Sequence, residues 1–318
     1  MPHIHRWDIP NPTLLVHILH GMAEHGARYR RLARALKAEG IAVWAHDHRG
    51  HGRTPPAPRN FGHFGDVNGW RLLIDDAWDV SSQMKKMYRR VPIVLFAHSM
   101  GSFIGQTLLA ERGNGYRAVV LCGTNGPPDF AERFLKELSV AQLKASHPRD
   151  PGVLLDGIMG QMFNRDFQPA ATSFDWLSSE PREVAKYISD RRCGFPLSAQ
   201  AWFDFLHGKA DLGSDLHVRM IPKTLPIRVI AGKLDPVGDR TKGVQRLLRL
   251  YGKHKLNVSH QFYANARHEL LNEVQPIRDR VTADLIAWLG QFHKRRGNRT
   301  RSGPSSSGRN RRSIPPPP

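Results

Sequence analysis

The sequence has few cysteines and no long apolar run. Cys122 and Cys193 are the only two cysteines in 318 residues, so no disulfide framework is expected, and no metal-ligand spacing is present. No apolar run approaches the roughly 18 residues that a membrane-spanning helix needs. The first residues also lack the apolar segment of a signal peptide. We therefore expect free thiols, a reducing compartment and a cytoplasmic location.

Negative charge is also scarce. The chain has 47 Lys and Arg against 28 Asp and Glu, for a formal net charge of +19. After His293 it has eight basic residues and no acid, in a segment rich in Arg, Ser, Gly and Pro that we expect to be disordered. Such charge favours anionic partners but does not determine a fold. Our hypothesis is that this tail contacts anionic membrane lipid at the periphery. Specific nucleic-acid binding is not expected, and the oligomeric state stays open.

Short continuous apolar runs alternate with amphipathic stretches. Continuous, β-branched runs are typical of parallel strands covered on both faces, and the alternation predicts an α/β fold with a mostly parallel sheet and helices on both faces. The predicted strands are Leu14–Leu19, Ile41–Ala45, Ile93–Ala97, Ala118–Cys122, Ile227–Ala231 and Val258–Tyr263. The predicted helices are Ala27–Glu39, Trp70–Tyr88, Ser99–Glu111, Thr241–Tyr251 and Gln275–Phe292.

A long insertion breaks this alternation. We predict a core made of residues 1–122 and 225–293, a cap insertion at 123–224 and the basic tail at 294–318. The insertion is rich in large apolar side chains, which either form a second small core, our preference for most of them, or line a substrate channel under a cap. Both can hold. The side chains are Phe130, Phe134, Leu138, Ile158, Met159, Met162, Phe163, Phe167, Trp176, Trp202, Phe203 and Phe205.

The strongest chemical signal lies where the third predicted strand meets a helix. The strand runs into Ala97-His98-Ser99-Met100-Gly101, a small-x-Ser-x-Gly turn typical of a nucleophile elbow. Small residues are needed there because strand and helix pack closely around a strained serine. Ala97 occupies a position where the usual motif has Gly, which adds one methyl group at a crowded place. We predict that Ser99 is a nucleophile.

Two later strands end in loops that contain partners for such a serine. In this arrangement an acid and a histidine follow the serine in chain order, each just beyond a strand. Asp235 is the first acid after the fifth predicted strand, with Asp239 as the less favoured alternative. His268 is the only histidine in the loop after the sixth predicted strand, whereas His260 lies within that strand. We predict Asp235 as the orienting acid and His268 as the general base.

An oxyanion hole needs two backbone N–H groups near the nucleophile. The residue after the nucleophile, Met100, supplies the first. The second should come from the loop after the first predicted strand, which reads His20-Gly21-Met22-Ala23-Glu24-His25-Gly26. We predict Met22, because Gly21 lets the backbone turn towards the serine. An ordinary strand-to-helix loop is the alternative interpretation of this segment.

Five ordered motifs resemble one family. Together they look like the monoacylglycerol lipase and lysophospholipase branch of the α/β-hydrolases, often grouped with the serine aminopeptidase-like hydrolases. The resemblance extends from about Trp7 to Phe292, and the insert segment Phe174–Trp202 looks like the cap of bacterial members. The motifs are HGMAEHGARY (His20–Tyr29), DHRGHGRT (Asp47–Thr54), AHSMG (Ala97–Gly101), GKLDPV (Gly232–Val237) and RHELLNE (Arg267–Glu273).

The resemblance implies the α/β-hydrolase fold, with a mainly helical cap inserted after the sixth strand. It implies hydrolysis of an ester of a single long acyl chain, such as a monoacylglycerol or a lysophospholipid, without a metal or organic cofactor. The family's triad falls on Ser99, Asp235 and His268, and its oxyanion hole on Met22 and Met100.

The N-terminus departs from the family pattern. Only 19 residues precede His20, where members usually have a full β-hairpin. His3 to Asp8 provides one strand of it, so either the edge is shortened or the true start lies upstream. We interpret Asp47, Arg49 and His51 as structural residues that brace the loop after the first predicted strand, His20–Gly26, which we call the oxyanion loop.

Other functions stay open at this point. A small-ester carboxylesterase or a peptidase of the same fold is the nearest alternative, because one fold supports many chemistries. A noncatalytic protein that binds acidic partners through its basic surface is the remote one. An apolar cap favours acyl chains over peptides, although apolar residues also build cores.

Overall fold

A seven-stranded sheet forms the centre of the protein. The computed structural model describes residues 1–54 and 60–293, so the predicted basic tail lies outside the described residues. The strand order is β1-β3-β2-β4-β5-β6-β7, and every neighbouring pair is parallel except β1 with β3. The strands are β1 (Ile4–Trp7), β2 (Leu14–Leu19), β3 (Ile41–His46), β4 (Ile93–His98), β5 (Ala118–Cys122), β6 (Ile227–Gly232) and β7 (Val258–Tyr263).

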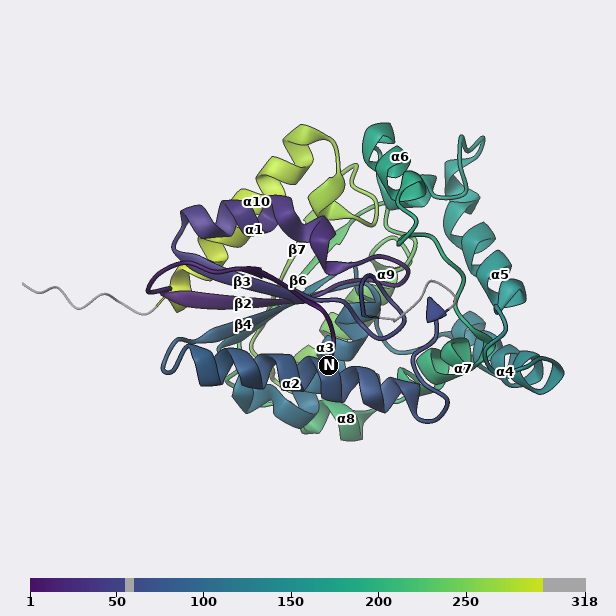
Figure 1. Ribbon diagram of the computed structural model, residues 1–318, viewed down its shortest axis with the longest axis horizontal. Coiled ribbons are helices and arrows are strands. Elements are labelled where there is room, and N and C mark those ends of the chain that lie inside the picture. Colours follow the sequence, from purple (N-terminus) through teal and green to yellow (C-terminus); the bar gives the residue numbers. More distant parts are fainter. Residues whose placement is uncertain (55–59, 294–318) are drawn as a thin grey trace, which may run out of the picture.

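Helices cover both faces of this sheet. In Figure 1, α1 and α10 lie on one face, and α2, α3 and α8 lie on the other. Two buried apolar clusters, one on each face, hold these layers together. None of the described helices is both long and apolar enough to cross a membrane. The helices flanking the sheet are α1 (Arg30–Ala38), α2 (Gly69–Met87), α3 (Met100–Arg112), α8 (Asp215–Arg219), α9 (Lys242–Lys253) and α10 (Gln275–Leu289).

The predicted mostly parallel sheet is confirmed, and the six predicted strands match β2 to β7 with ends that differ by at most one residue. The N-terminal segment contributes one strand, β1, which pairs antiparallel with β3. The large insertion therefore follows the fifth strand of this sheet. The expected position after the sixth strand counts both strands of an N-terminal hairpin, whereas one strand, β1, precedes β2 in the described residues. The first predicted helix is split into a 3-10 turn, Gly26–Tyr29, followed by α1.

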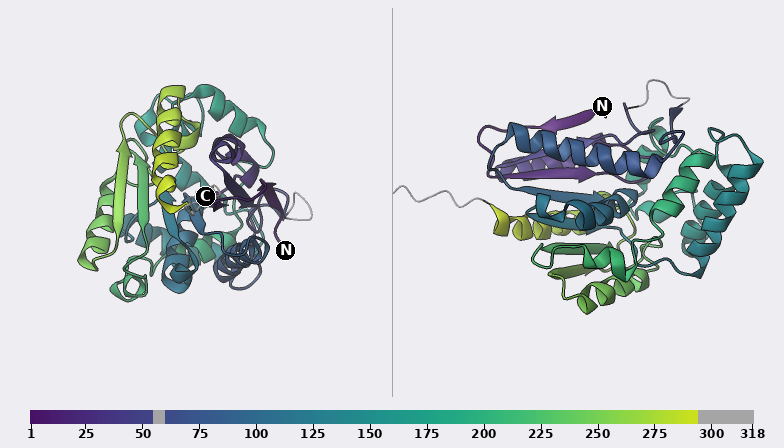
Figure 2. Two further views of the ribbon diagram at one scale, coloured as in Figure 1. Left: turned by 90° about the vertical axis from the view of Figure 1, so that its left-hand side faces the viewer. Right: turned by 90° about the horizontal axis from the view of Figure 1, so that it is seen from below.

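The segment between β5 and β6 is helical and lies mostly at one end of the sheet. Figures 1 and 2 show α4 to α7 gathered beyond this end. These helices are α4 (Phe130–Ala145), α5 (Val153–Asn164), α6 (Pro181–Ser189) and α7 (Ala199–Gly208), with short 3-10 turns at Arg165–Phe167 and Asp175–Leu177.

The interpretation of the insertion as a separate second core is wrong for its best-buried members. Trp202 and Phe205 of α7 belong to the same buried cluster as Phe103 of α3, so α7 extends the main core. By contrast, Phe130 and Phe134 of α4 are 86% and 60% exposed. The difference arises because α7 packs against α2, whereas α4 packs mainly against α7 and α5 of the insertion itself.

We expect this division to appear in stability measurements. Phe205→Ala should lower the free energy of unfolding by about 3 to 5 kcal/mol, because it opens a cavity in the main core. Phe134→Ala removes an exposed ring of the same size and should change that free energy by less than about 0.5 kcal/mol. Urea denaturation followed by circular dichroism measures both. Equal losses in the two variants would contradict the assignment of α7 to the main core.

Candidate functional site

Ser99 lies in a strained turn between β4 and α3. Its backbone has φ 52° and ψ −122°, a conformation that is costly for a residue with a Cβ. Its N–H donates to the carbonyl of Cys122 (2.9 Å), and its own carbonyl accepts from the backbone N–H of Ser102 (2.7 Å). A Cβ on Gly101 would lie 2.5 Å from the carbonyl oxygens of Leu19 and His20. The turn is therefore packed directly against the end of β2.

The methyl group of Ala97 is accommodated by a glycine on the neighbouring helix. Ala97 is fully buried, and Gly105 of α3 lies opposite it. A Cβ built on Gly105 would lie 2.9 Å from the Cβ of Ala97, closer than such atoms normally approach. The extra methyl at the elbow therefore needs a missing methyl on the helix, which explains how the departure from the usual motif is tolerated.

His268 and Asp235 form a buried hydrogen-bonded pair. Nδ1 of His268 donates to Oδ1 of Asp235 at 3.0 Å, and both side chains are buried. Oδ1 also accepts the N–H of Val237 (2.9 Å). Burial disfavours the charged imidazolium, but the charge and hydrogen bond of Asp235 outweigh it and raise the pKa of His268. With Nδ1 protonated, Nε2 is the nitrogen left to accept a proton. The alternative acid, Asp239, lies near Arg246 instead, at 3.6 Å.

The serine turn and the His268 loop meet around Gly123, just after β5. A Cβ on Gly123 would lie 2.9 Å from Cε1 of His268 and 3.1 Å from Cε1 of His98, the residue before Ser99. The rings of His98 and His268 are 4.7 Å apart. The described residues include no hydrogen bond between the Ser99 hydroxyl and His268, a bond that often tightens only in the complex with substrate.

The loop after β2 approaches the serine through Gly21. A Cβ on Gly21 would lie 3.1 Å from the Cβ of Ser99. The N–H of Gly21 donates to Oε1 of Glu24 (2.6 Å), and the N–H of Ala23 donates to Nε2 of His51 (3.1 Å). Between them, the N–H of Met22 has no partner among the described residues. The N–H of Met22 is thus available as a donor next to Gly21, the residue that approaches Ser99.

His20 holds the peptide group that carries this donor. Nε2 of His20 accepts the N–H of His48 (2.9 Å), so Nδ1 bears the proton and donates to the carbonyl of Gly21 (2.7 Å). That carbonyl and the N–H of Met22 belong to the same planar peptide. Burial lowers the pKa of His20 well below its ordinary value, so the ring stays neutral and keeps this tautomer. The second predicted donor, the N–H of Met100, is at the first residue of α3, where no intrahelical acceptor exists.

Two of the three residues interpreted as braces contact the oxyanion loop. His51 accepts from Ala23, and the carboxylate of Asp47 accepts the N–H groups of Gly26 (2.8 Å) and Arg53 (2.9 Å). Arg49 instead pairs with Asp76 of α2 at 2.6 Å. Arg49 therefore holds the loop after β3 against α2 instead of bracing the oxyanion loop.

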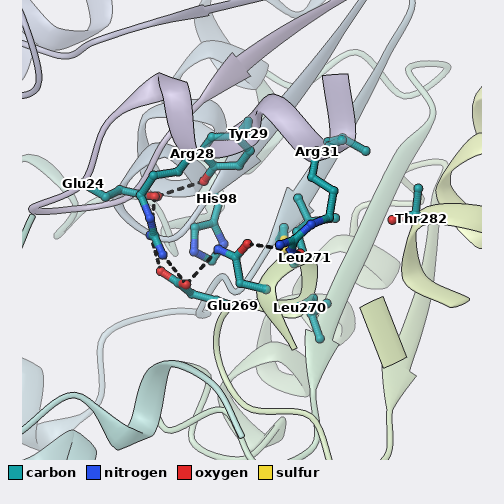
Figure 3. A pocket seen from close by; sticks show the side chains of 12 residues that line it. Glu24, Arg28, Tyr29, Arg31, His98, Glu269, Leu270, Leu271 and Thr282 are labelled. Atoms are coloured by element: carbon teal, nitrogen blue, oxygen red, sulfur yellow. Dashed lines mark hydrogen bonds and ion pairs between the residues drawn. The ribbon is translucent and has the colours of Figure 1, made fainter. Parts of the chain in front are cut away.

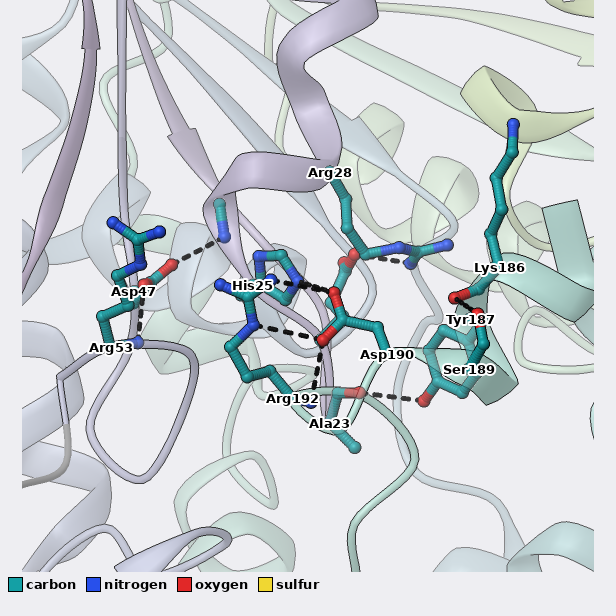
Figure 4. Close-up of polar contacts among 12 residues, drawn as sticks. Ala23, His25, Arg28, Asp47, Arg53, Lys186, Tyr187, Ser189, Asp190 and Arg192 are labelled. Carbon is teal, nitrogen blue, oxygen red and sulfur yellow. Dashed lines mark hydrogen bonds and ion pairs between the residues drawn. The ribbon is translucent and has the colours of Figure 1, made fainter. Parts of the chain in front are cut away.

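The insertion also contacts both loops of the site. The ring of Trp176 is 5.1 Å from that of His268, and the N–H of Glu269 donates to the carbonyl of Leu177 (2.7 Å). The carbonyl of Ala23 accepts the hydroxyl of Tyr187 (2.9 Å) (Figure 4) and the N–H of Gly194 (2.9 Å). The role of Tyr187 was missed in the sequence, because nothing in its neighbourhood along the chain distinguishes it from a core tyrosine.

Two groups of side chains in the described part of the chain bring metal-ligand atoms within 4.8 Å of one another. In both groups the carboxylate already has hydrogen-bond partners. In one of them, the Asp190 carboxylate accepts from the Arg192 guanidinium at 3.1 Å and is hydrogen-bonded to the His25 ring at 2.9 Å (Figure 4). The groups are His3, His5 and Asp47, and His25, Asp190 and Cys193.

The fold and the site together define a class. A mostly parallel sheet, a serine in a strained strand-to-helix turn and a buried His–Asp pair beside it are the features of α/β-hydrolases that use a serine. The chain is therefore a serine hydrolase of the α/β-hydrolase fold. More particularly, it belongs to the serine aminopeptidase S33 family, whose model matches residues 10–275.

Known lipases and esterases are similar to this chain in sequence and in structure. The chain is 28% identical to human monoglyceride lipase over 284 residues, covering 88% of this chain and 83% of that protein. It is 27% identical to a monoacylglycerol lipase of Mycolicibacterium smegmatis over 289 residues, covering 88% and 89%. A thermostable carboxyl esterase from Bacillus coagulans, solved with glycerol, superposes with a TM-score of 0.83 at 26% identity, covering 92% of this chain and 99% of that one. The predicted family resemblance is confirmed.

The packing of Ala97 against Gly105 gives a test at the elbow. Gly105→Ala should destabilise the protein by about 1 to 3 kcal/mol, because the added methyl overfills the contact. Adding Ala97→Gly to this variant should restore most of the loss, although Ala97→Gly alone costs about 0.5 to 1 kcal/mol. A double-mutant cycle from urea denaturation measures the coupling. Strictly additive effects would show that the two residues do not compete for one space.

Proposed function

We propose that this protein hydrolyses an ester of a single acyl chain through an acyl-enzyme on Ser99. Three features support the proposal: the strained Ser99 turn, the His268–Asp235 hydrogen bond of 3.0 Å and the unpartnered N–H of Met22 beside the serine. The His–Asp pair is the observation that carries it, because a buried carboxylate bonded to Nδ1 of a histidine holds the ring in the tautomer whose Nε2 can act as a base.

In the proposed mechanism, Nε2 of His268 accepts the proton from the Ser99 hydroxyl as the oxygen attacks the ester carbonyl. The resulting oxyanion accepts hydrogen bonds from the N–H groups of Met22 and Met100. His268 then gives its proton to the leaving alcohol, and the acyl group stays on Ser99. A water, deprotonated by His268, releases the fatty acid and restores the serine. Asp235 stabilises the imidazolium in both halves.

We propose a monoacylglycerol as the first substrate to test and a lysophospholipid as the second. The similarity to two monoacylglycerol lipases over most of both chains supports this choice. We also propose that residues 123–224 act as a cap over the site, since Trp176 lies against His268. Two other substrate classes are alternatives to a lipid ester. A short-chain ester is favoured by the likeness to the carboxyl esterase, and a peptide amide by the family description.

The decisive assay compares fatty-acid release from a monoacylglycerol and a lysophospholipid with release from short p-nitrophenyl esters. We expect turnover of the long-chain monoacylglycerol, and a loss of at least about 10³-fold in Ser99→Ala, because the nucleophile is removed. Hydrolysis of the short esters alone would replace the lipid assignment by a carboxylesterase. If Ser99→Ala abolishes no ester hydrolysis, the proposed function is wrong.

A matched pair of variants tests the acid within the same assay. Asp235→Asn should lower kcat by about 10⁴-fold, because the amide favours the wrong tautomer of His268. Asp239→Asn makes the same chemical change four residues away, at a side chain that faces Arg246, and should retain most of the activity. Equal effects of the two changes would contradict the assignment of Asp235.

The proposed membrane contact of the tail, 294–318, needs its own measurement. Clustered cations contribute about 1 kcal/mol each near an anionic bilayer. The full chain should therefore sediment with vesicles containing phosphatidylserine at low salt, and a chain ending at His293 should sediment less. Equal sedimentation of the two would end the membrane hypothesis for this segment.

A further inference from the structure

Three ionisable side chains, largely buried, form a cluster beside His98 and next to the loop that contains His268. Arg28 lies between two carboxylates: it donates to Oε2 of Glu24 at 2.8 Å, and to Oε1 and Oε2 of Glu269 at 2.5 and 2.7 Å. The exposed fractions of the three side chains are 4% for Glu24, 13% for Arg28 and 6% for Glu269. Figure 3 shows Arg28 reaching both carboxylates beside His98, at a small cavity of about 20 Å³. We call this the Glu24–Arg28–Glu269 cluster.

The cluster joins the two loops that carry the proposed chemistry. Glu24 belongs to the oxyanion loop, where it accepts the N–H of Gly21 (2.6 Å) and the hydroxyl of Tyr29 (2.8 Å). Glu269 directly follows His268. Arg28 therefore connects the peptide before Met22 to the residue after the general base, across 241 positions of sequence.

The cluster also carries an imbalance of charge. Two carboxylates share one guanidinium, which leaves one net negative charge in a buried place. Burial alone would favour a protonated Glu269, but the charge and hydrogen bonds of Arg28 outweigh it and hold the pKa of that carboxyl below its ordinary value. The carboxyl group of Glu24 accepts hydrogen bonds from Gly21, Tyr29 and Arg28 and donates none among the described residues.

Arg267, the residue before His268, is bonded to the insertion: its guanidinium donates to the carbonyls of Asp175 (2.5 Å) and Ser178 (3.1 Å). Other groups that adjoin the His268 ring carry no positive charge. Asp235 faces it from the loop after β6 and is itself an acid. His98, at the end of β4, is neutral, because burial lowers its pKa to about 4. Cys122, at the end of β5, is a neutral thiol whose pKa burial raises. From the insertion, the group that packs on the ring is the uncharged Trp176.

We propose that the Glu24–Arg28–Glu269 cluster is a positioning element of the active site. Through the bond from the Gly21 N–H to Glu24, it holds the backbone of Gly21, the residue before Met22, beside Ser99. It also places one net negative charge next to His268 when that ring takes the proton of Ser99. The proposal rests on the proposed role of His268 as the general base. All three residues act through other groups and need not touch the substrate.

Opposite changes of charge should shift the pH dependence in opposite directions. The base must be unprotonated, so kcat/KM falls as the pH drops through the pKa of His268. Glu269→Gln removes the net negative charge and should move this acid limb to lower pH, by on the order of one unit, because a nearby negative charge stabilises the imidazolium. Arg28→Gln leaves two uncompensated carboxylates and should move it to higher pH. Arg28→Lys keeps the charge and should leave the limb near its wild-type position.

A matched control separates this effect from a general structural one. Glu183 of α6 also pairs with an arginine, Arg31, at 2.7 Å, but it does not adjoin His268 in the chain. Glu183→Gln should leave the acid limb unchanged. If Glu269→Gln does not move the limb to lower pH relative to Glu183→Gln, the proposal is wrong. The comparison of Glu269→Gln with Glu183→Gln tests the proposal even if Arg28→Gln does not fold.

A second readout keeps this proposal distinct from the proposed function. In the Ser99→Ala background, the proton NMR signal of the His268 ring reports its titration without any turnover. Glu269→Gln should move that titration to lower pH in the same direction as the kinetic limb. Absence of ester hydrolysis with a shifted titration would reject the proposed function alone. Hydrolysis with coincident titrations in both chains would reject the cluster alone.

Discussion

The strained backbone of Ser99 is the constraint around which the site is arranged. A conformation of this kind costs on the order of 1 to 3 kcal/mol and persists only where the surroundings leave no alternative. Here those surroundings are the carbonyl of Cys122, which accepts the N–H of Ser99, and the contact of Gly101 with the end of β2. Because β2 and β4 are adjacent parallel strands, the same contact brings the loop after β2 beside the serine. The free N–H of Met22 follows from that adjacency.

The buried polar groups around the site fall into two kinds, neutral histidine rings and a cluster of charged side chains. On the side of the oxyanion loop, His20, His48 and His51 are buried, and burial lowers their pKa values, so they act as neutral donors and acceptors to backbone groups. Beside His268, the guanidinium of Arg28 joins the carboxylates of Glu24 and Glu269. The neutral rings fix peptide geometry, and the Arg28 cluster reaches the same loop through Glu24, which accepts the N–H of Gly21. The ionised cluster adds negative charge where an imidazolium would form.

The insertion is tied to the rest of the protein unevenly. Its α7 buries Trp202 and Phe205 in the main core, and the segment around Trp176 and Tyr187 contacts the loop after β2 and the loop that contains His268. Helix α4 instead exposes Phe130 on its surface. One inserted stretch thus contains parts that complete the fold and parts that contribute little to the core.

Much of the fold could be predicted because its signals are local. Mostly continuous apolar runs indicated six of the seven strands, although Val258–Tyr263 also contains polar residues. Ser99, Asp235 and His268 are predicted site residues because each follows one of these strands. The local signal failed where partners are distant. Phe134 and Phe205 are equally apolar in the sequence, but only the packing of α7 on α2 decides which one is buried. The preference for a second core therefore failed for Trp202 and Phe205, whereas Trp176 packs against a small separate cluster of Leu177, Tyr187 and Cys193.

By itself, the sequence indicated the strands along the chain, the serine turn and the loops that contain the candidate acids and the histidine, because each depends on residues adjacent in the chain. Only the tertiary structure decided which of Asp235 and Asp239 bonds to His268, how Gly105 makes room for Ala97, and that Arg28 joins Glu24 to Glu269. The physical reason is that hydrogen bonds and close packing depend on which surfaces meet, and these surfaces come from segments far apart in the chain.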